Sequence, residues 1–306
     1  MTRRTAFGLL AAVGAGFAAL GGLVRSLTGP APRPKVVAGT TRTKEAYGEL
    51  PRQFGEWWLP PGETGGETGG ETGGETGTGL LPTVVLVHGG YWRTGYDLTL
   101  ENAVAADLAG RGFLVWNIDY RPSSDPWPAT LTDVALAFDH TAKGRYASRI
   151  DRDRLAVVGH SAGGQLALWL ASRPRIATGE PGAGPTLPAP TLAVGQAPVA
   201  GLAEGALLGL GGGAVQALLG GTPASVADRY AAADPSALLP TGVPTVLIHA
   251  QGDSIVPISQ SEGYLAAATA AGDTCRLVRV PGGHFEHLDP ASEAVAALRA
   301  ALASWG

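Results

Sequence analysis

The sequence predicts an α/β fold in which a mostly parallel sheet carries helices on both faces. Short apolar runs rich in Val, Leu and Ile alternate with longer segments of helical pattern from residue 83 onward. Strands that alternate with helices are typical of a parallel sheet that is buried on both sides. Such sheets bind ligands beyond the carboxyl ends of their strands, so the residues directly after each strand are the first candidates for function.

The individual elements follow from this alternation. The apolar runs predict strands at Thr83–His88, Phe113–Asp119, Arg154–Gly159, Thr191–Gln196, Thr245–Ala250 and Cys275–Val280. The segments between them predict helices at Leu98–Ala109, Ala129–Thr141, Ala162–Ser172, Ser259–Ala271 and Ala291–Ser304. A further strand is expected in the sequence QFGEWWLP at residues 53–60. The chain has 306 residues, and we place a single large domain at residues 35–306.

The composition excludes several classes of function. Hydrophobic residues make up 45% of the chain and charged residues 16%, which is typical of a folded protein. The net charge of −4 provides no basic face for nucleic acid. The single cysteine, Cys275, excludes an internal disulfide framework and a metal site of several thiolates, and it is expected to be a small buried side chain.

Residues 1–34 are expected to direct the chain out of the cytoplasm. Arg3 and Arg4 precede an uncharged run from Thr5 to Val24 that is rich in Gly and Ala, which is the pattern of an export signal. The arginine pair resembles a twin-arginine signal, whose passengers cross the membrane already folded. The run is also about long enough to span a bilayer, so an uncleaved membrane anchor is the alternative. Without a working leader the protein would stay in the cytoplasm.

A second unusual segment is the four-residue repeat GETG between residues 62 and 79. It contains no apolar residue and therefore has nothing to bury. We interpret it as a flexible surface insertion that lengthens one connection between strands. Its four glutamates match no calcium-binding loop.

The sequence GHSAGG at residues 159–164 predicts a nucleophilic serine at Ser161. An apolar strand precedes this G-x-S-x-G motif and a helix follows it, which is the context that the motif requires. The glycines at 159 and 163 are explained by a turn so tight that larger side chains beside the serine would clash. His160 occupies the variable position of the motif, and its side chain is expected to point away from the chemistry.

A serine hydroxyl needs a base, and the base needs an orienting acid. Around a serine of this kind the acid and then the histidine follow along the chain. Asp253 comes after the strand Thr245–Ala250, and His284 comes after the strand Cys275–Val280. The alternatives stay open: Asp234 and Asp273 are rival acids that do not directly follow a strand, and His287 is a rival base.

His287 is otherwise read as a solvated or capping histidine, and His88, His140 and His249 as core or surface residues. The pair His284 and His287 could indicate a metal site, but no second cluster of ligands completes one.

The sequence HGGYW at residues 88–92 predicts an oxyanion hole. Attack on a carbonyl creates an oxyanion, which backbone N–H groups can stabilise where glycines let the chain approach closely. The expected donors are the amides of Gly90, Tyr91 and Ala162. Tyr91 and Trp92 are expected to wall the pocket, with Trp92 as a candidate substrate-binding residue. Core packing is the alternative for Trp92.

These motifs together resemble the α/β-hydrolases of the esterase/lipase superfamily from about Tyr47 onward. HGGYW, GHSAGG, DYRPSSDPWPA, QGDSIVPISQSEGY and GGHF look most like the branch of arylformamidases (kynurenine formamidases) and small carboxylesterases. The segment YGELPRQFGEWWLP is similar to the paired first strands of that branch. The resemblance implies a mostly parallel eight-stranded sheet, the triad Ser161–Asp253–His284, and neither cofactor nor metal.

The remaining segment, residues 197–240, has a helical and weakly polar pattern and is expected to form a small cap over the carboxyl edge of the sheet. Two activities then compete. The first is hydrolysis of small carboxylic esters through an acyl-enzyme. The second is cleavage of N-formyl aryl amides such as N-formylkynurenine, which fits an exported protein poorly. A non-catalytic member of the fold would usually lack one triad residue. The expected partner is a small-molecule substrate, and the oligomeric state stays open.

Overall fold

An eight-stranded sheet is the framework of the protein. The computed structural model describes residues 40–63, 79–184 and 189–305. The predicted leader at residues 1–34 lies outside the described residues, and so does the GETG repeat between residues 64 and 78. The described residues belong to one compact unit that begins after residue 34.

The strand order is β1-β2-β4-β3-β5-β6-β7-β8, and most pairs are parallel. Only β1 with β2 and β2 with β4 are antiparallel. The other neighbours are parallel, which confirms the predicted eight-stranded, mostly parallel sheet. The strands are β1 (Thr41–Ala46), β2 (Phe54–Leu59), β3 (Leu81–Val87), β4 (Leu114–Ile118), β5 (Ile150–His160), β6 (Leu192–Gln196), β7 (Thr245–Ala250) and β8 (Cys275–Val280).

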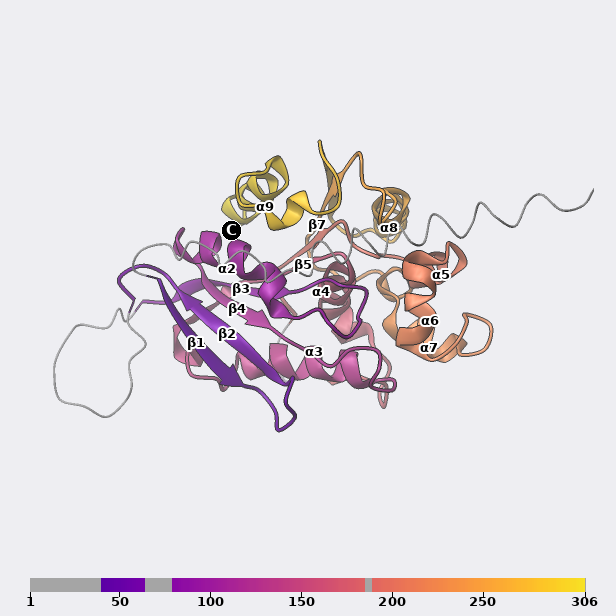
Figure 1. Ribbon diagram of the computed structural model, residues 1–306, viewed down its shortest axis with the longest axis horizontal. Helices are drawn as coiled ribbons and strands as arrows, with labels where there is room; N and C mark the ends of the chain where they lie inside the picture. The colour runs from indigo at the N-terminus through magenta and orange to yellow at the C-terminus, as the bar shows by residue number, and fades with distance from the viewer. Residues whose placement is uncertain (1–39, 64–78, 185–188, 306) are drawn as a thin grey trace, which may run out of the picture. The chain divides into compact units, whose positions relative to one another are not determined.

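Helices cover both faces of this sheet (Figure 1). The α-helices are α2 (Asn102–Ala109), α3 (Ala129–His140), α4 (Ala162–Ser172), α5 (Leu202–Leu207), α6 (Ala214–Leu219), α7 (Ala227–Ala233), α8 (Ser259–Ala270) and α9 (Glu293–Ala303). Short 3₁₀ helices are η1 (Leu98–Glu101), η2 (Ala147–Arg149), η3 (Arg173–Arg175), η4 (Leu210–Gly212), η5 (Pro235–Leu238) and η6 (Glu286–Leu288).

Strand β3 shows how one apolar run serves two cores. Val85 and Val87 belong to the cluster that includes α3, α4 and α8. Val84 and Leu86 belong to the second cluster, with α2 and α9. Successive side chains of a strand point to opposite faces, so a strand between two helical layers must be apolar at every position. This explains why the central strands are continuous apolar runs rather than alternating ones.

The structure differs from the predicted elements in two places that matter for the sheet. The segment YGELPRQFGEWWLP was expected to contain both of the first two strands. Its first part, residues 47–53, is instead the turn between them, and the edge strand β1 precedes that turn. Strand β5 begins at Ile150 and not at Arg154, because Ile150 pairs with Leu81 at the start of β3 before an irregularity shifts the register to Thr83 and Leu155. The predicted helix Leu98–Ala109 divides into η1 and α2.

The predicted cap segment follows β6 and precedes β7 in the chain, and it contains α5, α6, α7 and η5. Its helices α5, α6 and α7 are drawn in orange at the right of Figure 1. Its glycine-rich turn packs on the loop after β3, since a Cβ at Gly211 would lie 2.8 Å from the ring of Tyr91. Arg93 also donates a hydrogen bond to the carbonyl of Gly211. Within the described ranges, no helix is both long enough and apolar enough to span a membrane.

Candidate active site

Ser161 stands in a sharp turn between β5 and α4. Its backbone has φ +58° and ψ −120°, which a non-glycine residue adopts only under constraint. The N–H of Ser161 donates to the carbonyl of Gln196, 2.8 Å away, and so fixes the turn to β6. A Cβ at Gly159 would overlap the carbonyl oxygen of Gly163, and one at Gly163 would overlap that of Val87. The turn therefore requires glycine at both positions that flank the serine.

Asp253 and His284 come together at the ends of β7 and β8. Nδ1 of His284 lies 2.6 Å from Oδ2 of Asp253, and both side chains are buried. The other carboxylate oxygen, Oδ1, accepts hydrogen bonds from the amides of Ile255 and Val256 at 2.8 and 2.9 Å. An ionised carboxylate only accepts, so Nδ1 carries the hydrogen, and in the neutral ring Nε2 keeps its lone pair. This is the tautomer of a general base.

The carboxyl of Asp253 is held in its ionised form. Burial alone would raise its pKa, but hydrogen bonds from His249 and His284 outweigh burial and hold the pKa well below its usual range. A charged carboxylate behind His284 stabilises the imidazolium that forms when the base takes a proton.

The residue next to Ser161 connects the two halves of this site. Nε2 of His160 lies 2.9 Å from the carbonyl oxygen of His284, and the two rings are 4.5 Å apart between centroids. Among the described residues no hydrogen bond joins Ser161 Oγ to His284 Nε2. In unliganded enzymes such contacts are often long and shorten only when substrate binds.

The loop after β3 lies directly against Ser161. A Cβ at Gly89 would be 3.1 Å from Cβ of Ser161. Gly90 has φ +110°, and any side chain there would overlap the ring of Tyr96. The amides of Gly90, Tyr91 and Ala162 donate no hydrogen bond to any described residue. Free N–H groups beside a nucleophile are what an oxyanion hole requires.

The segment that contains Ser161 is similar to parts of known proteins. The family model described as BD-FAE matches residues 74–178. Carboxylesterase NlhH of Mycobacterium tuberculosis is 33% identical over 102 residues, 33% of this chain and 32% of that protein. Kynurenine formamidase of Drosophila melanogaster is 30% identical over 105 residues, 34% of each chain. These matches thus span about a third of the relatives' length.

The solved structure of esterase B from Lactobacillus rhamnosis matches nearly the whole chain. It has a TM-score of 0.74 at 21% identity and covers 97% of this chain and 93% of that one. This likeness shows the fold. The chain has the α/β-hydrolase fold, and part of it is similar to carboxylesterases and to a kynurenine formamidase.

The two aromatic residues of this α/β-hydrolase that follow Gly90 have different surroundings. Both have positive φ, +53° for Tyr91 and +54° for Trp92. The Tyr91 ring is half-buried, and its hydroxyl donates to the carbonyl of Ile255 at 3.0 Å. Trp92 is only 1% exposed and its Nε1 donates to Oε1 of Gln165 at 3.2 Å. The structure therefore places Trp92 in the core, as in the alternative considered above, and leaves Tyr91 at the site.

Two expectations about histidines were wrong. His160 was expected to point away from the chemistry, but its ring packs on His284. His287 was expected to be solvated or capping, but it is fully buried in η6, and burial lowers its pKa to about 3. Its Nδ1 lies 3.5 Å from Nε2 of Gln196, and its Nε2 has no partner among the described atoms. Of these two histidines, His284 is the one within hydrogen-bond distance of Asp253.

The rival acids have structural roles. Asp234 accepts hydrogen bonds from the amides of Ala203 and Ser236. Asp273 accepts from the amides of Thr241 and Gly242. Among the described residues neither forms a hydrogen bond or an ion pair with a histidine, whereas Asp253 contacts both His249 and His284.

A polar network behind the oxyanion loop escaped sequence reasoning. His88 Nε2 lies 3.1 Å from Asp119, which also binds the guanidinium of Arg52. The hydroxyl of Tyr120 donates to the carbonyl of His88 at 2.7 Å, and their rings stack at 4.2 Å. The start of the loop after β3 is therefore fixed by Asp119 and Tyr120, which follow β4, and indirectly by Arg52, which precedes β2. The signal in the sequence was the acidic residue directly after β4, at the expected edge of the sheet.

No metal site accompanies the histidines: the described ranges contain no group of three or more His, Cys, Asp or Glu side chains able to hold an ion.

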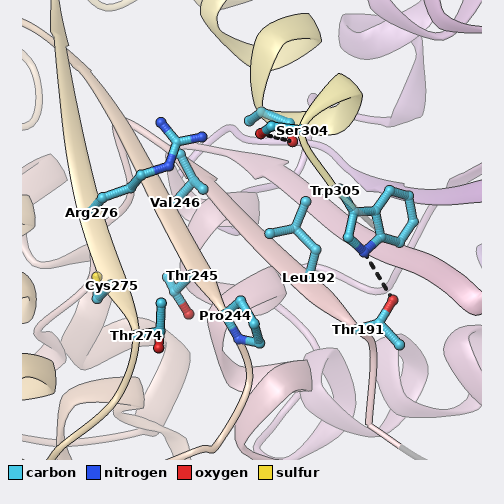
Figure 2. A pocket seen from close by; sticks show the side chains of 11 residues that line it. Thr191, Leu192, Pro244, Thr245, Val246, Thr274, Cys275, Arg276, Ser304 and Trp305 are labelled. Carbon is cyan, nitrogen blue, oxygen red and sulfur yellow. Dashed lines mark hydrogen bonds between the residues drawn. The ribbon is translucent and has the colours of Figure 1, made fainter.

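A hollow of about 250 Å³ lies at the opposite edge of the sheet (Figure 2). Thr191, Thr245 and Cys275 line it from the starts of β6, β7 and β8, whereas Ser161, Asp253 and His284 follow the ends of their strands. Trp305 closes one side and donates from Nε1 to Oγ1 of Thr191 at 3.0 Å. Burial raises the pKa of the Cys275 thiol to about 12, which keeps it unreactive.

Proposed function

We propose that this α/β-hydrolase cleaves small carboxylic esters through an acyl-enzyme formed on Ser161. The observation that carries the proposal is the short contact between His284 Nδ1 and Asp253 Oδ2, 2.6 Å, beside a serine held in a strained turn. Nucleophile, base and acid follow β5, β8 and β7, whose ends share one edge of the sheet.

In the first half of the reaction Ser161 Oγ attacks the ester carbonyl while Nε2 of His284 takes the hydroxyl proton. The bond from carbonyl carbon to alkoxy oxygen then breaks, and the imidazolium returns the proton to the departing alcohol. In the second half a water molecule repeats these steps on the acyl-enzyme and releases the acid. Asp253 stays ionised throughout and stabilises the imidazolium.

The negative oxygen of each tetrahedral intermediate is stabilised by the amides of Gly90, Tyr91 and Ala162. None of them donates to a described residue, so no competing bond has to break when the oxyanion forms. Loss of one such donor costs on the order of 10²–10³ in kcat in a comparable enzyme.

The second candidate is hydrolysis of N-formyl aryl amides on the same residues. One observation favours it: a relative over part of the chain is a kynurenine formamidase. A turnover panel of aryl acetates, longer acyl esters and an N-formyl aryl amide separates the two activities. We expect the highest kcat/KM on the short esters. A higher kcat/KM on the formyl amide than on the esters would show that the protein is an amidase. If neither esters nor the formyl amide were turned over, both proposed activities would be wrong.

We also propose that the protein works outside the cytoplasm. The support is the sequence of residues 1–34, with Arg3 and Arg4 before an apolar run. Replacing both arginines with lysine is expected to leave the enzyme in the cytoplasm if the leader is of the twin-arginine type. Normal export of that variant would indicate a general secretory signal or an anchor, and carbonate extraction of membranes would distinguish these two.

A further inference from the structure

Asp253 has a second histidine beside it that the proposed mechanism does not use. Nε2 of His249 lies 3.5 Å from Oδ2 of Asp253, the same oxygen that faces His284. The side chains of His249 and Asp253 are both fully buried. His249 is the second-last residue of β7, four residues before the acid.

His249 is itself held from both sides. Its Nε2 lies 3.0 Å from the carbonyl oxygen of Val256, and its Nδ1 lies 2.8 Å from Oγ of Ser261 on α8. A carbonyl oxygen only accepts, so Nε2 carries a hydrogen. That hydrogen is directed at Val256 and is shared in part with the more distant Asp253. In the neutral ring Nδ1 accepts from the hydroxyl of Ser261.

These contacts satisfy the buried carboxylate completely. Two backbone amides donate to Oδ1 of Asp253, and the two imidazoles approach Oδ2. A buried charge is stable only when hydrogen bonds replace the water that it lost. Rotation of the Asp253 side chain away from His284 would break contacts on both oxygens at once.

We propose that His249 is a positioning residue that keeps the Asp253 carboxylate ionised and aimed at Nδ1 of His284. This inference rests on the proposed function, because it gives His249 its effect through the acid and base of that reaction. His249 lies on β7, and its side chain contacts the carbonyl of Val256, which follows Asp253 in the loop after that strand. The loop that carries Asp253 is thus fastened to β7 on both sides of the acid. Ser261 couples the same ring to α8.

The test compares three substitutions in the full chain. His249→Leu keeps much of the volume and removes the donor. His249→Gln keeps an N–H donor at a similar distance from the backbone. His249→Asn keeps a polar group near Ser261 but withdraws the donor from Asp253. His140→Gln is the matched control, since His140 is also a buried histidine with a carboxylate partner, Glu45, and lies on α3.

Two quantities are measured: kcat and KM on p-nitrophenyl acetate, and the low-field proton resonance of the Nδ1–H of His284. We expect His249→Leu to lower kcat by on the order of 10–100-fold, as for loss of a group that orients a reacting side chain. KM should change little, and the resonance should broaden or vanish. His249→Gln should restore most of kcat and the resonance. If His249→Leu does not fold, His249→Asn takes its place, with the same expectation.

Parent-like kcat and resonance in His249→Leu or in His249→Asn would overturn the proposal. Equal loss of kcat in the Leu and Gln variants with an intact resonance would also overturn it, because packing alone would then explain the effect. The control variant should match the parent in both measurements. If the parent turns over no ester, the proposed function fails, but the resonance still reports whether His249 positions Asp253.

Discussion

The hydroxyl of Tyr91 donates a hydrogen bond to the carbonyl of Ile255, 3.0 Å away. The two residues follow β3 and β7, and in the sheet β5 and β6 lie between these strands. The side chain of Tyr91 thus passes from the oxyanion loop to the acid loop, and the turn at Gly211 covers its ring. We expect a fixed aromatic ring at this position to limit the space beside Ser161.

This bridge predicts a preference for short acyl groups. We expect acetyl and butyryl esters to have a higher kcat/KM than octanoyl and longer esters, because the ring occupies volume that a long chain would need. Each excluded methylene is worth about 1–3 kcal/mol in such a pocket. The measurement is kcat/KM across a p-nitrophenyl ester series for the parent and for Tyr91→Ala, in which the ratio of octanoyl to acetyl turnover should rise.

Tyr91→Phe is the control, since it removes the hydrogen bond to Ile255 and keeps the ring. A parent optimum at ten carbons or more would contradict the prediction and would show that Tyr91 borders a long acyl channel.

Ser161→Ala should abolish turnover. Removal of a nucleophile lowers kcat on the order of 10⁴–10⁶-fold, while the fold should persist because alanine is smaller than serine. A fluorophosphonate probe should label the parent and the control variant Ser304→Ala, but not Ser161→Ala. Labelling of another serine would contradict the assignment of the nucleophile.

The two histidines of the GGHFEH segment should separate in their effects. His284→Ala should match Ser161→Ala in its loss of kcat, because Asp253 contacts only His284 of this pair at hydrogen-bond distance. His287→Gln should retain most activity and unfold at a lower temperature, because His287 is fully buried. Turnover and thermal unfolding of both variants provide the check, and the reverse order of activity would assign the base to His287.

Glu101 predicts a pH dependence of stability. Both its carboxyl oxygens are buried without a partner among the described atoms, and burial raises its pKa to about 8 from 4.5. Between these values the folded chain keeps a proton that the unfolded chain releases. The unfolded state then binds fewer protons, so stability falls as pH rises, by up to about 1.4 kcal/mol per pH unit.

Glu101→Gln should remove this loss, because the amide stays neutral at every pH. Urea unfolding at pH 5 and at pH 8 measures it: the free energy of unfolding should differ less between the two pH values in the variant than in the parent. An equal difference in both proteins would show that Glu101 is ionised or solvated in the folded state.

The sequence was sufficient for the parts of this fold that local pattern determines. The central strands are apolar at every position because both faces are buried, and the elbow around Ser161 is marked by glycines that only its turn requires. The pairing of Asp253 with His284 was expected from the sequence, because residues that follow parallel strands lie together at one edge of the sheet.

Strand β1 escaped prediction because it is an edge strand with half of its side chains exposed, and TRTKEA carries no apolar run. The burial of His287 also escaped it, and for His249 and Trp92 the sequence left a buried position as one of two alternatives. Each of these side chains is buried by elements distant in the sequence, as Trp92 is by α4. The local sequence pattern around a residue does not indicate such long-range contacts.

The pairing of β8 with β7 has a consequence for the order in which the candidate site assembles. His284 lies 123 residues after Ser161, at the end of the last strand to join the sheet in chain order. A nascent chain that already contains the elbow and the acid has no base until this strand docks. Long-range parallel pairing is a slow step in folding. On the proposed mechanism, hydrolytic activity begins only when the C-terminal edge of the sheet has assembled, and the onset of turnover during refolding reports completion of the whole domain.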